Sequence, residues 1–167
     1  MKKLLIVGAG SFSTEIDELA RLLGYTETVF ADDHPEGARI GPVIAGTDNL
    51  PALKDDCPEA IAALGNNESR MKYHRILREA GFRVPVLVHP TAYVSPDASL
   101  APGCIVRTRA VVSRYVSLGE ACIVNVGALI DHDCVFGEGC HILMGAVVRN
   151  KVTVPAMTWI KANQVYE

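Results

Sequence analysis

The sequence has neither a surplus of basic residues nor a long apolar run. Lysine and arginine together number 16 against 19 aspartates and glutamates, which gives a formal net charge of −3 at pH 7. A dedicated nucleic-acid-binding protein usually carries a basic surplus, so this composition argues against that class. No stretch approaches the ~18 apolar residues of a membrane-spanning helix. We therefore expect neither a nucleic-acid partner nor a membrane partner.

The sequence also lacks the features of a secretion signal. Residues 4–7 are apolar, but Gly8, Ala9 and Gly10 follow at once, and this apolar run is too short for a signal peptide. The 5 cysteines are an odd number, which favours free thiols over a disulfide framework. These features predict a cytoplasmic protein, and its 167 residues suffice for one or two small domains.

A period of six residues runs through the second half of the sequence. Every sixth residue is large and apolar, and the residue four positions further on is almost always small. Strands alternate with period two and helices with period 3.6, so a sustained period of six indicates a repeat architecture. The large residues of this pattern are Val88, Val94, Leu100, Val106, Val112, Leu118, Val124, Ile130, Phe136, Ile142, Val148, Val154 and Ile160.

This pattern predicts a solenoid in which each flat side takes one hexad. The large residue would point inward, the small residue would fit near a corner, and three hexads would close one triangular coil. Successive coils would then pair as parallel strands. The pattern resembles that of the hexapeptide-repeat family, whose fold is a left-handed parallel β-helix. The left hand is implied by this resemblance, because crossover rules alone favour right-handed connections.

All cysteines except Cys57 occupy the small position of a hexad. Cys104, Cys122 and Cys140 are spaced by 18 residues, so we expect them to stack along one edge of the solenoid in successive coils. Because a buried free cysteine commonly packs as a small apolar residue, we favour packing over a metal site for these side chains and for Cys134.

The first half of the sequence alternates between apolar runs and amphipathic stretches. Residues 3–7, 28–31 and 60–64 are typical of buried parallel strands. Helices are expected after the first and third of these runs, and a short helical stretch is expected at residues 50–53. The predicted fold class is α/β + β. A small Rossmann-like βαβ domain over residues 1–85 leads, without a flexible linker, into a left-handed β-helix over residues 86–167.

Three loops of the first domain are expected to bind a ligand. The turn at residues 8–13 keeps Gly8 and Gly10 of the dinucleotide-binding fingerprint but has Ser13 in place of its third glycine. Gly10 is expected to adopt a positive φ angle and to let the backbone approach a phosphate. Asp32 lies 22 residues after Gly10, where an acidic ligand of a ribose would sit. These two loops and residues 65–68 leave the carboxyl ends of adjacent parallel strands, which predicts a nucleotide-containing ligand at that edge.

A polar cluster interrupts the aliphatic repeat between residues 125 and 141. His132 falls at a corner position that faces away from the core, and Asp133 follows it directly. Histidine is the natural proton acceptor at neutral pH, and a neighbouring carboxylate can hold one of its tautomers. His141 occupies the outward position of a later hexad. The cluster therefore favours general-base chemistry at His132 over a surface histidine with no function.

The two-part layout resembles the bacterial sugar-nucleotide acetyltransferases of the PglD/NeuD type. The resemblance covers nearly the whole chain, and its best-matching pieces are residues 32–33, 65–68 and 131–141. It implies an N-acetyltransferase that moves an acetyl group from acetyl-CoA to an amino group on a nucleotide-linked sugar. It also implies a homotrimer with the active site between subunits. Acetyl-CoA would be the co-substrate, and no metal is expected.

The resemblance also assigns roles to individual residues. The family's general base matches His132, the acidic residue that assists it matches Asp133, and a histidine that contacts acetyl-CoA matches His141. Asn150 lies 18 residues after His132, so we expect it at the same corner one coil further on, where its N–H could stabilise an oxyanion. The residues expected to bind the nucleotide sugar are Gly10, Ser11, Phe12, Asp32, Asp33, Gly65, Asn66 and Asn125, and those expected to bind acetyl-CoA are His141, Asn150 and Ala162.

The sequence departs from the family pattern in two places, and other functions stay open. Residues 11–13 read Ser-Phe-Ser where the family usually has Gly-His-Gly, and the repeat stops at Glu167 where the family commonly carries further coils. One alternative is a sugar O-acetyltransferase. Another is a metal-dependent hydratase of the γ-carbonic-anhydrase kind, which needs three imidazoles on one metal. An NAD-dependent enzyme and a non-catalytic nucleotide-sugar-binding scaffold are the remaining alternatives.

Overall fold

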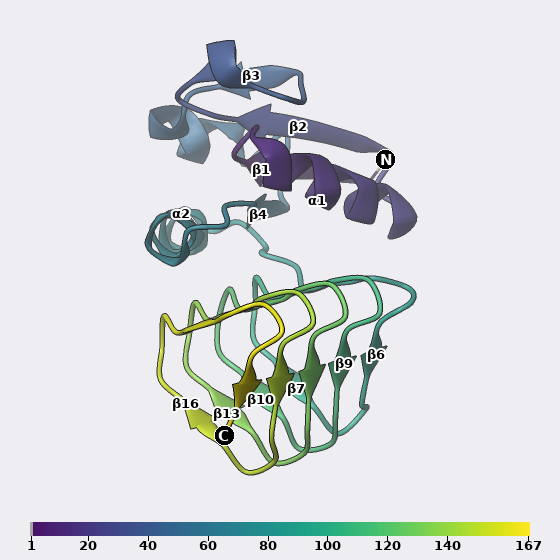
Figure 1. Ribbon diagram of the computed structural model, residues 1–167. Coiled ribbons are helices and arrows are strands. Elements are labelled where there is room, and N and C mark those ends of the chain that lie inside the picture. Colours follow the sequence, from purple (N-terminus) through teal and green to yellow (C-terminus); the bar gives the residue numbers. More distant parts are fainter. Residues whose placement is uncertain (1) are drawn as a thin grey trace. The chain divides into compact units, whose positions relative to one another are not determined.

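A computed structural model describes residues 2–167 of the chain (Figure 1). The chain divides into two compact units, and the division falls between Pro85 and Val86. We call residues 2–85 the front unit and residues 86–167 the solenoid. Each unit has an apolar core of its own, and each is described by itself.

The front unit is built on a parallel sheet of four strands in the order β3-β2-β1-β4. Its strands are β1 (Lys3–Val7), β2 (Glu27–Ala31), β3 (Val43–Ala45) and β4 (Ala60–Ala62). β1 lies in the middle of the sheet, and residues 4–7 are buried, as expected for an apolar strand covered on both faces. The sequence pattern does not predict β3, because three partly exposed residues at a sheet edge are too few to show a periodicity.

Helices connect the strands of this sheet. The α-helices are α1 (Ser11–Leu22) and α2 (Asn67–Glu79), and the 3₁₀ helices are η1 (Pro35–Gly37) and η2 (Thr47–Leu53). Asn66 caps α2, because its side-chain oxygen accepts a hydrogen bond from the backbone N–H of Ser69 at 2.9 Å. The two predicted α-helices and the short helical stretch within η2 are thus confirmed. Within residues 2–167, none of the helices is long and apolar enough to cross a membrane.

The solenoid consists of two-residue strands that stack, coil upon coil, into three parallel sheets (Figure 1). Each strand pairs with the strand one coil further on, as Leu87 pairs with Ile105. The sheets have the orders β16-β13-β10-β7, β17-β14-β11-β8-β5 and β18-β15-β12-β9-β6. The strands are β5 (Leu87–Val88), β6 (Tyr93–Val94), β7 (Ser99–Leu100), β8 (Ile105–Val106), β9 (Val111–Val112), β10 (Ser117–Leu118), β11 (Ile123–Val124), β12 (Leu129–Ile130), β13 (Val135–Phe136), β14 (His141–Ile142), β15 (Val147–Val148), β16 (Thr153–Val154), β17 (Trp159–Ile160) and β18 (Val165–Tyr166).

The second residue of each strand packs into the interior of the solenoid. These are the large apolar residues of the six-residue period, and from Val106 to Ile160 each of them is at most 3% exposed. The small residues of the hexads, such as Ala110 and Ala128, pack in the same core. The predicted coil of three hexads, with a large inward residue and a small corner residue in each, is confirmed.

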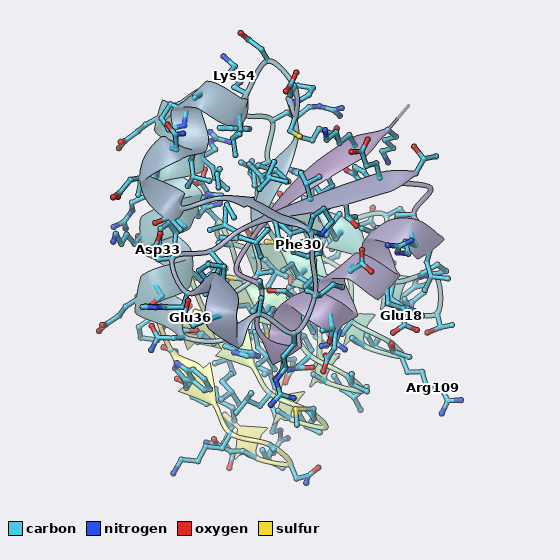
Figure 2. All side chains as sticks on the ribbon, turned by 90° about the horizontal axis from the view of Figure 1, so that it is seen from above. Glu18, Phe30, Asp33, Glu36, Lys54 and Arg109 are labelled. Atoms are coloured by element: carbon cyan, nitrogen blue, oxygen red, sulfur yellow. The ribbon has the colours of Figure 1, made fainter. Side chains whose placement is uncertain are left out.

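The corners of the solenoid require a left-handed backbone conformation. Every sixth residue from Gly103 to Asn163 has a positive φ angle, between 53° and 80°. Glycine fills some of these positions, but Arg109, whose side chain extends outward in Figure 2, and Asp133 fill others. The left-handed conformation costs a non-glycine residue about 1–2 kcal/mol. A backbone hydrogen bond to the previous coil offsets this cost, and the N–H of Asp133, for example, donates to the carbonyl oxygen of Arg114 at 3.1 Å.

The cysteines of the repeat pack along the solenoid as free thiols. At one edge each thiol donates to a carbonyl oxygen of a neighbouring coil. Hydrogen bonding with Cys104, and to a smaller extent burial, raise the pKa of the Cys122 thiol to about 12. The predicted stack of cysteines along one edge is thus confirmed. The Sγ atoms of Cys104, Cys122 and Cys140 lie 3.1, 3.2 and 3.1 Å from the oxygens of Gly119, Gly137 and Pro155.

At Gly137 the backbone of the next coil approaches closely. A Cβ atom at this position would lie 2.4 Å from the backbone nitrogen of Ala156. We expect Gly137→Ala to lower the free energy of unfolding by about 3 kcal/mol, because the backbone of the next coil cannot yield without breaking its own pairing. Urea denaturation at a fixed protein concentration measures this loss.

Gly127→Ala is the matched control within the solenoid. Gly127 has a φ angle of +65° but no atom within 4 Å of the added Cβ, so only the backbone conformation is penalised, at about 1 kcal/mol. Equal losses of stability in the two variants would contradict the close packing of coils at Gly137.

Candidate functional site

The front unit has a cavity at the carboxyl end of its parallel sheet. Residues from the ends of β1, β2 and β4 meet there, together with residues of η2 and α2. Residues of the first two loops singled out in the sequence line this cavity, whereas Gly65 and Asn66 of the third loop do not, and Leu64 and Ser69 on either side of that loop line it instead. The lining residues are Val7, Gly8, Ala31, Asp32, Asp33, His34, Thr47, Leu64, Ser69 and Tyr73.

Asp32 ties the turn after β1 to the loop after β2. One of its carboxylate oxygens accepts the backbone N–H of Ala9 at 2.7 Å, and the other accepts the backbone N–H of His34 at 2.8 Å. Each oxygen of a carboxylate has a second lone pair, so both can accept one further hydrogen bond from a ligand hydroxyl. Asp32 thus holds the loops in place and still presents acceptors to the cavity.

Asp33 is held by groups that the sequence analysis did not single out. One carboxylate oxygen accepts the backbone N–H of Thr47 at 2.7 Å, and the other accepts the Thr47 hydroxyl at 2.7 Å and the Tyr73 hydroxyl at 3.4 Å. These hydrogen bonds, that of the Thr47 side chain first, lower the pKa of Asp33. Figure 2 labels Asp33 away from Phe30, which is buried and lies near the middle of that view. Asp33 is therefore an ionised and fixed acceptor at the cavity.

The glycine-rich turn uses its two glycines differently from the expectation. Gly10 has a φ angle of −82°, so the predicted positive φ angle at Gly10 is wrong. Gly8 has a φ angle of +105°, and a Cβ atom there would lie 3.1 Å from both the carbonyl oxygen of Ala63 and the hydroxyl of Ser13. The reason is local, because the chain reverses direction directly at the end of β1. Gly8 lines the cavity, whereas Gly10, Ser11 and Phe12 do not.

Ser13 replaces the third glycine of the fingerprint without opening the turn. Its side chain is 1% exposed, and its hydroxyl donates to the carbonyl oxygen of Ala63 at 3.2 Å. The first turn of α1 is thereby tied to the end of β4. A glycine at this position normally permits close packing of helix and strand, and here a hydrogen-bonded serine fits the same space.

Arg70 fixes the loop that contains Gly65 and Asn66. This arginine is fully buried, and one of its terminal nitrogens donates to the carbonyl oxygens of Leu64 and Gly65 at 3.0 and 3.1 Å. The other terminal nitrogen donates to the side chain of Asn67 at 2.7 Å. A buried guanidinium needs such acceptors. If the loop moved, the charge of Arg70 would be exposed or would lose its hydrogen-bond acceptors, so these bonds hold the loop in place. The pattern of the sequence does not reveal this role, since arginine is usually a surface residue.

The solenoid has a second cavity, which surrounds His132. The lining residues come from β6 and from successive turns on one edge, and they are Tyr93, Ser113, Arg114, Tyr115, Asp131, His132 and Asp133. The Arg114 guanidinium donates to Asp97 at 2.9 Å and to the Tyr115 hydroxyl at 3.0 Å. Neither Arg114 nor Tyr115 was singled out in the sequence, although Arg114 lies one coil before His132.

His132 lies in the turn between β12 and β13, with its side chain 44% exposed. Its Nδ1 atom is 2.6 Å from Oδ2 of Asp133, and its Nε2 atom is 3.4 Å from Nδ2 of Asn150. A carboxylate can only accept, so Nδ1 carries the hydrogen and the lone pair of the neutral ring is on Nε2. The structure thus brings His132, Asp133 and Asn150 together, with the lone pair on the nitrogen that does not face the carboxylate.

His141 and Asn125 form a separate pair on another sheet of the solenoid. His141 is the first residue of β14 and is 4% exposed, and its ring lies 4.9 Å from that of Trp159. The side-chain nitrogen of Asn125 is 3.1 Å from Nε2 of His141. Neither residue lines the cavity at His132, and Ala162 lies exposed in the turn between β17 and β18. Within residues 2–167, no group of three or more histidines, cysteines, aspartates or glutamates is arranged to hold a metal ion.

Comparison with known proteins agrees with this architecture. Residues 3–77 match the model of the PglD N-terminal domain. The acetyltransferase domain of PglB from Neisseria gonorrhoeae FA1090, solved in complex with acetyl coenzyme A, is 34% identical with a TM-score of 0.84, and the match covers 95% of this chain and 87% of that one. The chain belongs to the PglD-type sugar-nucleotide acetyltransferases of the hexapeptide-repeat family.

A second solved structure similar to this chain contains both CoA and a nucleotide-linked sugar. It is a mutant of perosamine N-acetyltransferase from Caulobacter crescentus in complex with CoA and GDP-perosamine. It is 28% identical with a TM-score of 0.88, and the match covers 99% of this chain and 88% of that one. The expected fold class, a small Rossmann-like region followed by a left-handed parallel β-helix, is confirmed by these similarities and by the stacked parallel sheets.

The hydroxyl of Thr47 is the main cause of the lowered pKa of Asp33. We expect Thr47→Val to raise this pKa toward its ordinary value, because the ionised carboxylate loses its side-chain donor. A carboxyl group whose pKa is lower in the folded than in the unfolded state stabilises the protein above the unfolded-state pKa. This stabilisation is lost as the pH falls through the folded-state pKa. In Thr47→Val the folded-state pKa moves toward the unfolded-state pKa, so this stabilisation should be smaller and its loss should be complete at a higher pH. Titration of the carboxyl carbon of Asp33 by NMR measures the change.

Thr153→Val, on an exposed strand of the solenoid, provides the control and should leave the titration of Asp33 unchanged. An unaltered pKa of Asp33 in Thr47→Val would mean that the carboxylate is held by other groups.

Proposed function

We propose that the protein is an acetyl-CoA-dependent N-acetyltransferase that acts on an amino sugar linked to a nucleotide. The observation that carries this proposal is the pair of His132 and Asp133 in the solenoid cavity, with Nδ1 and Oδ2 2.6 Å apart. Membership of the acetyltransferase family, and the CoA and GDP-perosamine bound to the relative from Caulobacter crescentus, support the reaction and the substrate class.

His132 acts as the general base in this reaction. The amine nitrogen of the acceptor attacks the carbonyl carbon of the acetyl thioester, a C–N bond forms, and the proton of the amine passes to Nε2 of His132. The tetrahedral intermediate then collapses, the C–S bond breaks, and the departing thiolate takes the proton from Nε2 to give free CoA. Asp133 accepts the hydrogen bond from Nδ1 throughout and favours the imidazolium that forms between the two steps.

The intermediate carries a negative charge on the former carbonyl oxygen, and this oxyanion needs a hydrogen-bond donor. We assign this role to the backbone N–H of Asn150. Asn150 lies at the same corner as His132 one coil further on, and the adjoining N–H of Lys151 donates to the carbonyl oxygen of His132 at 3.0 Å. The backbone at Asn150 is therefore fixed relative to the base by coil stacking.

The cavity of the front unit binds the nucleotide part of the acceptor. Asp32 and Asp33 present fixed oxygen acceptors to ribose or base donors, and the turn at residues 8–13 offers the N-terminus of α1 to the diphosphate. Gly10 has open space around it, so its role is to leave room for the ligand. Leu64 and Ser69 line the cavity on either side of the loop at Gly65 and Asn66, and Arg70 holds that loop.

Acetyl-CoA is proposed to bind along the solenoid. His141, Asn150 and Ala162 are the residues assigned to its site. The indole of Trp159 covers His141 and is itself 46% exposed, so it offers an apolar surface beside this histidine. The amide nitrogen of Asn125 lies 3.1 Å from Nε2 of His141, and the amide oxygen of Asn125 accepts the backbone N–H of Val126 at 2.8 Å.

We also propose that three copies of the chain associate into a homotrimer. The sheet β18-β15-β12-β9-β6 presents apolar residues outward, of which Tyr93, Leu129 and Val165 are 57%, 42% and 59% exposed. An exposed apolar row of this kind favours a protein interface. The neighbouring sheet β16-β13-β10-β7 is more polar, because its one large exposed apolar residue, Val135 (48% exposed), lies between Ser117 and Thr153. A second copy on the apolar row would cover it and would place another chain beside the cavity at His132.

The proposed reaction is tested by supplying acetyl-CoA and a panel of nucleotide-linked amino sugars and measuring the release of CoA thiol. We expect His132→Ala to lower kcat by about 10²–10⁴-fold, because proton removal from the acceptor is no longer assisted. The dissociation constant of the nucleotide sugar should stay nearly unchanged, since its binding rests on the front unit.

His89→Ala is the matched control for His132→Ala. His89 is another histidine of the solenoid, hydrogen-bonded to Thr91 and absent from both cavities. Its replacement should leave kcat unchanged. Near-full activity of a folded His132→Ala variant would show that another group takes the proton.

The assembly is tested with Leu129→Asp. A carboxylate in the centre of the apolar row should dissociate the trimer into monomers, because burial of an unpaired charge is costly. Multi-angle light scattering measures the mass, and activity should fall together with it. Thr153→Asp on the neighbouring sheet is the control and should remain trimeric. A monodisperse monomer of the wild-type protein would contradict the assembly.

A further inference from the structure

Asn150 contacts the nitrogen of His132 that the proposed reaction uses. Its side-chain Nδ2 lies 3.4 Å from Nε2, while Asp133 occupies Nδ1 at 2.6 Å. We propose that the side chain of Asn150 is a positioning residue that, with Asp133, holds the imidazole at both nitrogens and directs the Nε2 lone pair into the cavity. This role rests on the proposed function of His132 as the base, and it is distinct from the role of the Asn150 backbone.

The hydrogen-bonding capacity of the three side chains fixes the direction of both contacts. Asp133 accepts from Nδ1, so the neutral ring has its lone pair on Nε2 and needs a donor there. The amide nitrogen of Asn150 is such a donor, whereas its amide oxygen is not. The contact at Nε2 is the longer of the two, so the incoming amine of the acceptor can replace Asn150 while Asp133 keeps its bond.

The ring needs a second contact because little else restrains it. The side chain of His132 is 44% exposed, and rotation of an imidazole about its Cβ–Cγ bond has only broad preferences. The backbone of both partners, Asp133 and Asn150, is held by hydrogen bonds between coils. The N–H of Asp133 donates to the carbonyl oxygen of Arg114 at 3.1 Å, and the N–H of Lys151, next to Asn150, donates to the carbonyl oxygen of His132 at 3.0 Å. The two contacts are therefore as rigid as the stack of coils.

A carboxylate in place of the Asn150 amide would reverse the chemistry at Nε2. Asn150→Asp keeps the shape of the side chain but offers only acceptors, so the ring would keep a hydrogen on each nitrogen between two carboxylates. The other ionisable groups around the ring stay as they are, and they are Asp131, Asp133, Arg114 with its partner Asp97, Tyr93 and Tyr115. A ring protonated at Nε2 cannot accept the proton of the acceptor.

The experiment compares three variants of the full chain. Asn150→Asp should lower kcat by about 10²-fold, the order expected for loss of a general base. Asn150→Leu removes the donor without adding an acceptor, and kcat should fall about three- to tenfold, in line with loss of one neutral hydrogen bond. Lys151→Ala, at the next residue of the same turn, should keep the wild-type kcat. The KM for the nucleotide sugar should stay unchanged in all three variants, since its binding rests on the front unit.

Nitrogen-15 NMR of the histidine rings, with His132→Ala used to assign the signals, tests the positions of the hydrogens without any substrate. In alkaline buffer the wild-type ring should carry hydrogen on Nδ1 alone, and the Asn150→Asp ring should keep hydrogen on both nitrogens. If this pattern holds while the wild-type protein transfers no acetyl group, the proposed function fails and the positioning of the ring stands. A wild-type ring protonated at Nε2, or an Asn150→Asp variant with wild-type kcat, would overturn the proposal.

Discussion

The backbone hydrogen bonds between successive coils are the interaction on which the solenoid and its catalytic site depend. They pair each strand with the next coil, and at the corners from Ala121 to Asn163 they hold a residue in the left-handed conformation. One of these corners bears Asp133, and the same corner one coil further on bears Lys151. Because both residues are fixed by coil stacking, the side chains of Asp133 and Asn150 reach the two nitrogens of His132 from adjacent coils. The geometry proposed for catalysis thus follows from the regular stacking of the coils.

The front unit achieves a similar fixation by a different device. Its loops have no repeat to hold them, so buried and partly buried polar groups join them to each other. Asp32 joins the turn after β1 to the loop after β2, and Arg70 gathers the carbonyl oxygens of Leu64 and Gly65. Burial of such polar groups costs desolvation free energy, and this cost is offset only when all their hydrogen bonds are made. The result is a preformed cavity whose acceptors are in place before a ligand arrives.

Much of the architecture could be predicted from the sequence because regularly spaced residue types indicate it. The period of six gives the inward residues, the triangular coil and the stack at Cys104, Cys122 and Cys140 directly. The edge of the sheet where three loops meet follows from the parallel order of apolar runs. The edge strand β3 could not be predicted, because three residues are too few to show a periodicity. The sequence also could not indicate that Gly8, and not Gly10, has the positive φ angle, because glycine permits either sign at both positions.

The sequence by itself determined the solenoid, the two-part organisation and the adjacency of His132 and Asp133, since all three depend on residues that are close in the chain or equally spaced along it. The tertiary structure decided which groups complete the sites. Thr47 and Tyr73 reach Asp33 from η2 and α2, and Asn125 turns toward His141 instead of toward a cavity. These contacts join residues far apart in the chain and depend on side-chain direction within a packed fold, and neither spacing nor residue type specifies that direction.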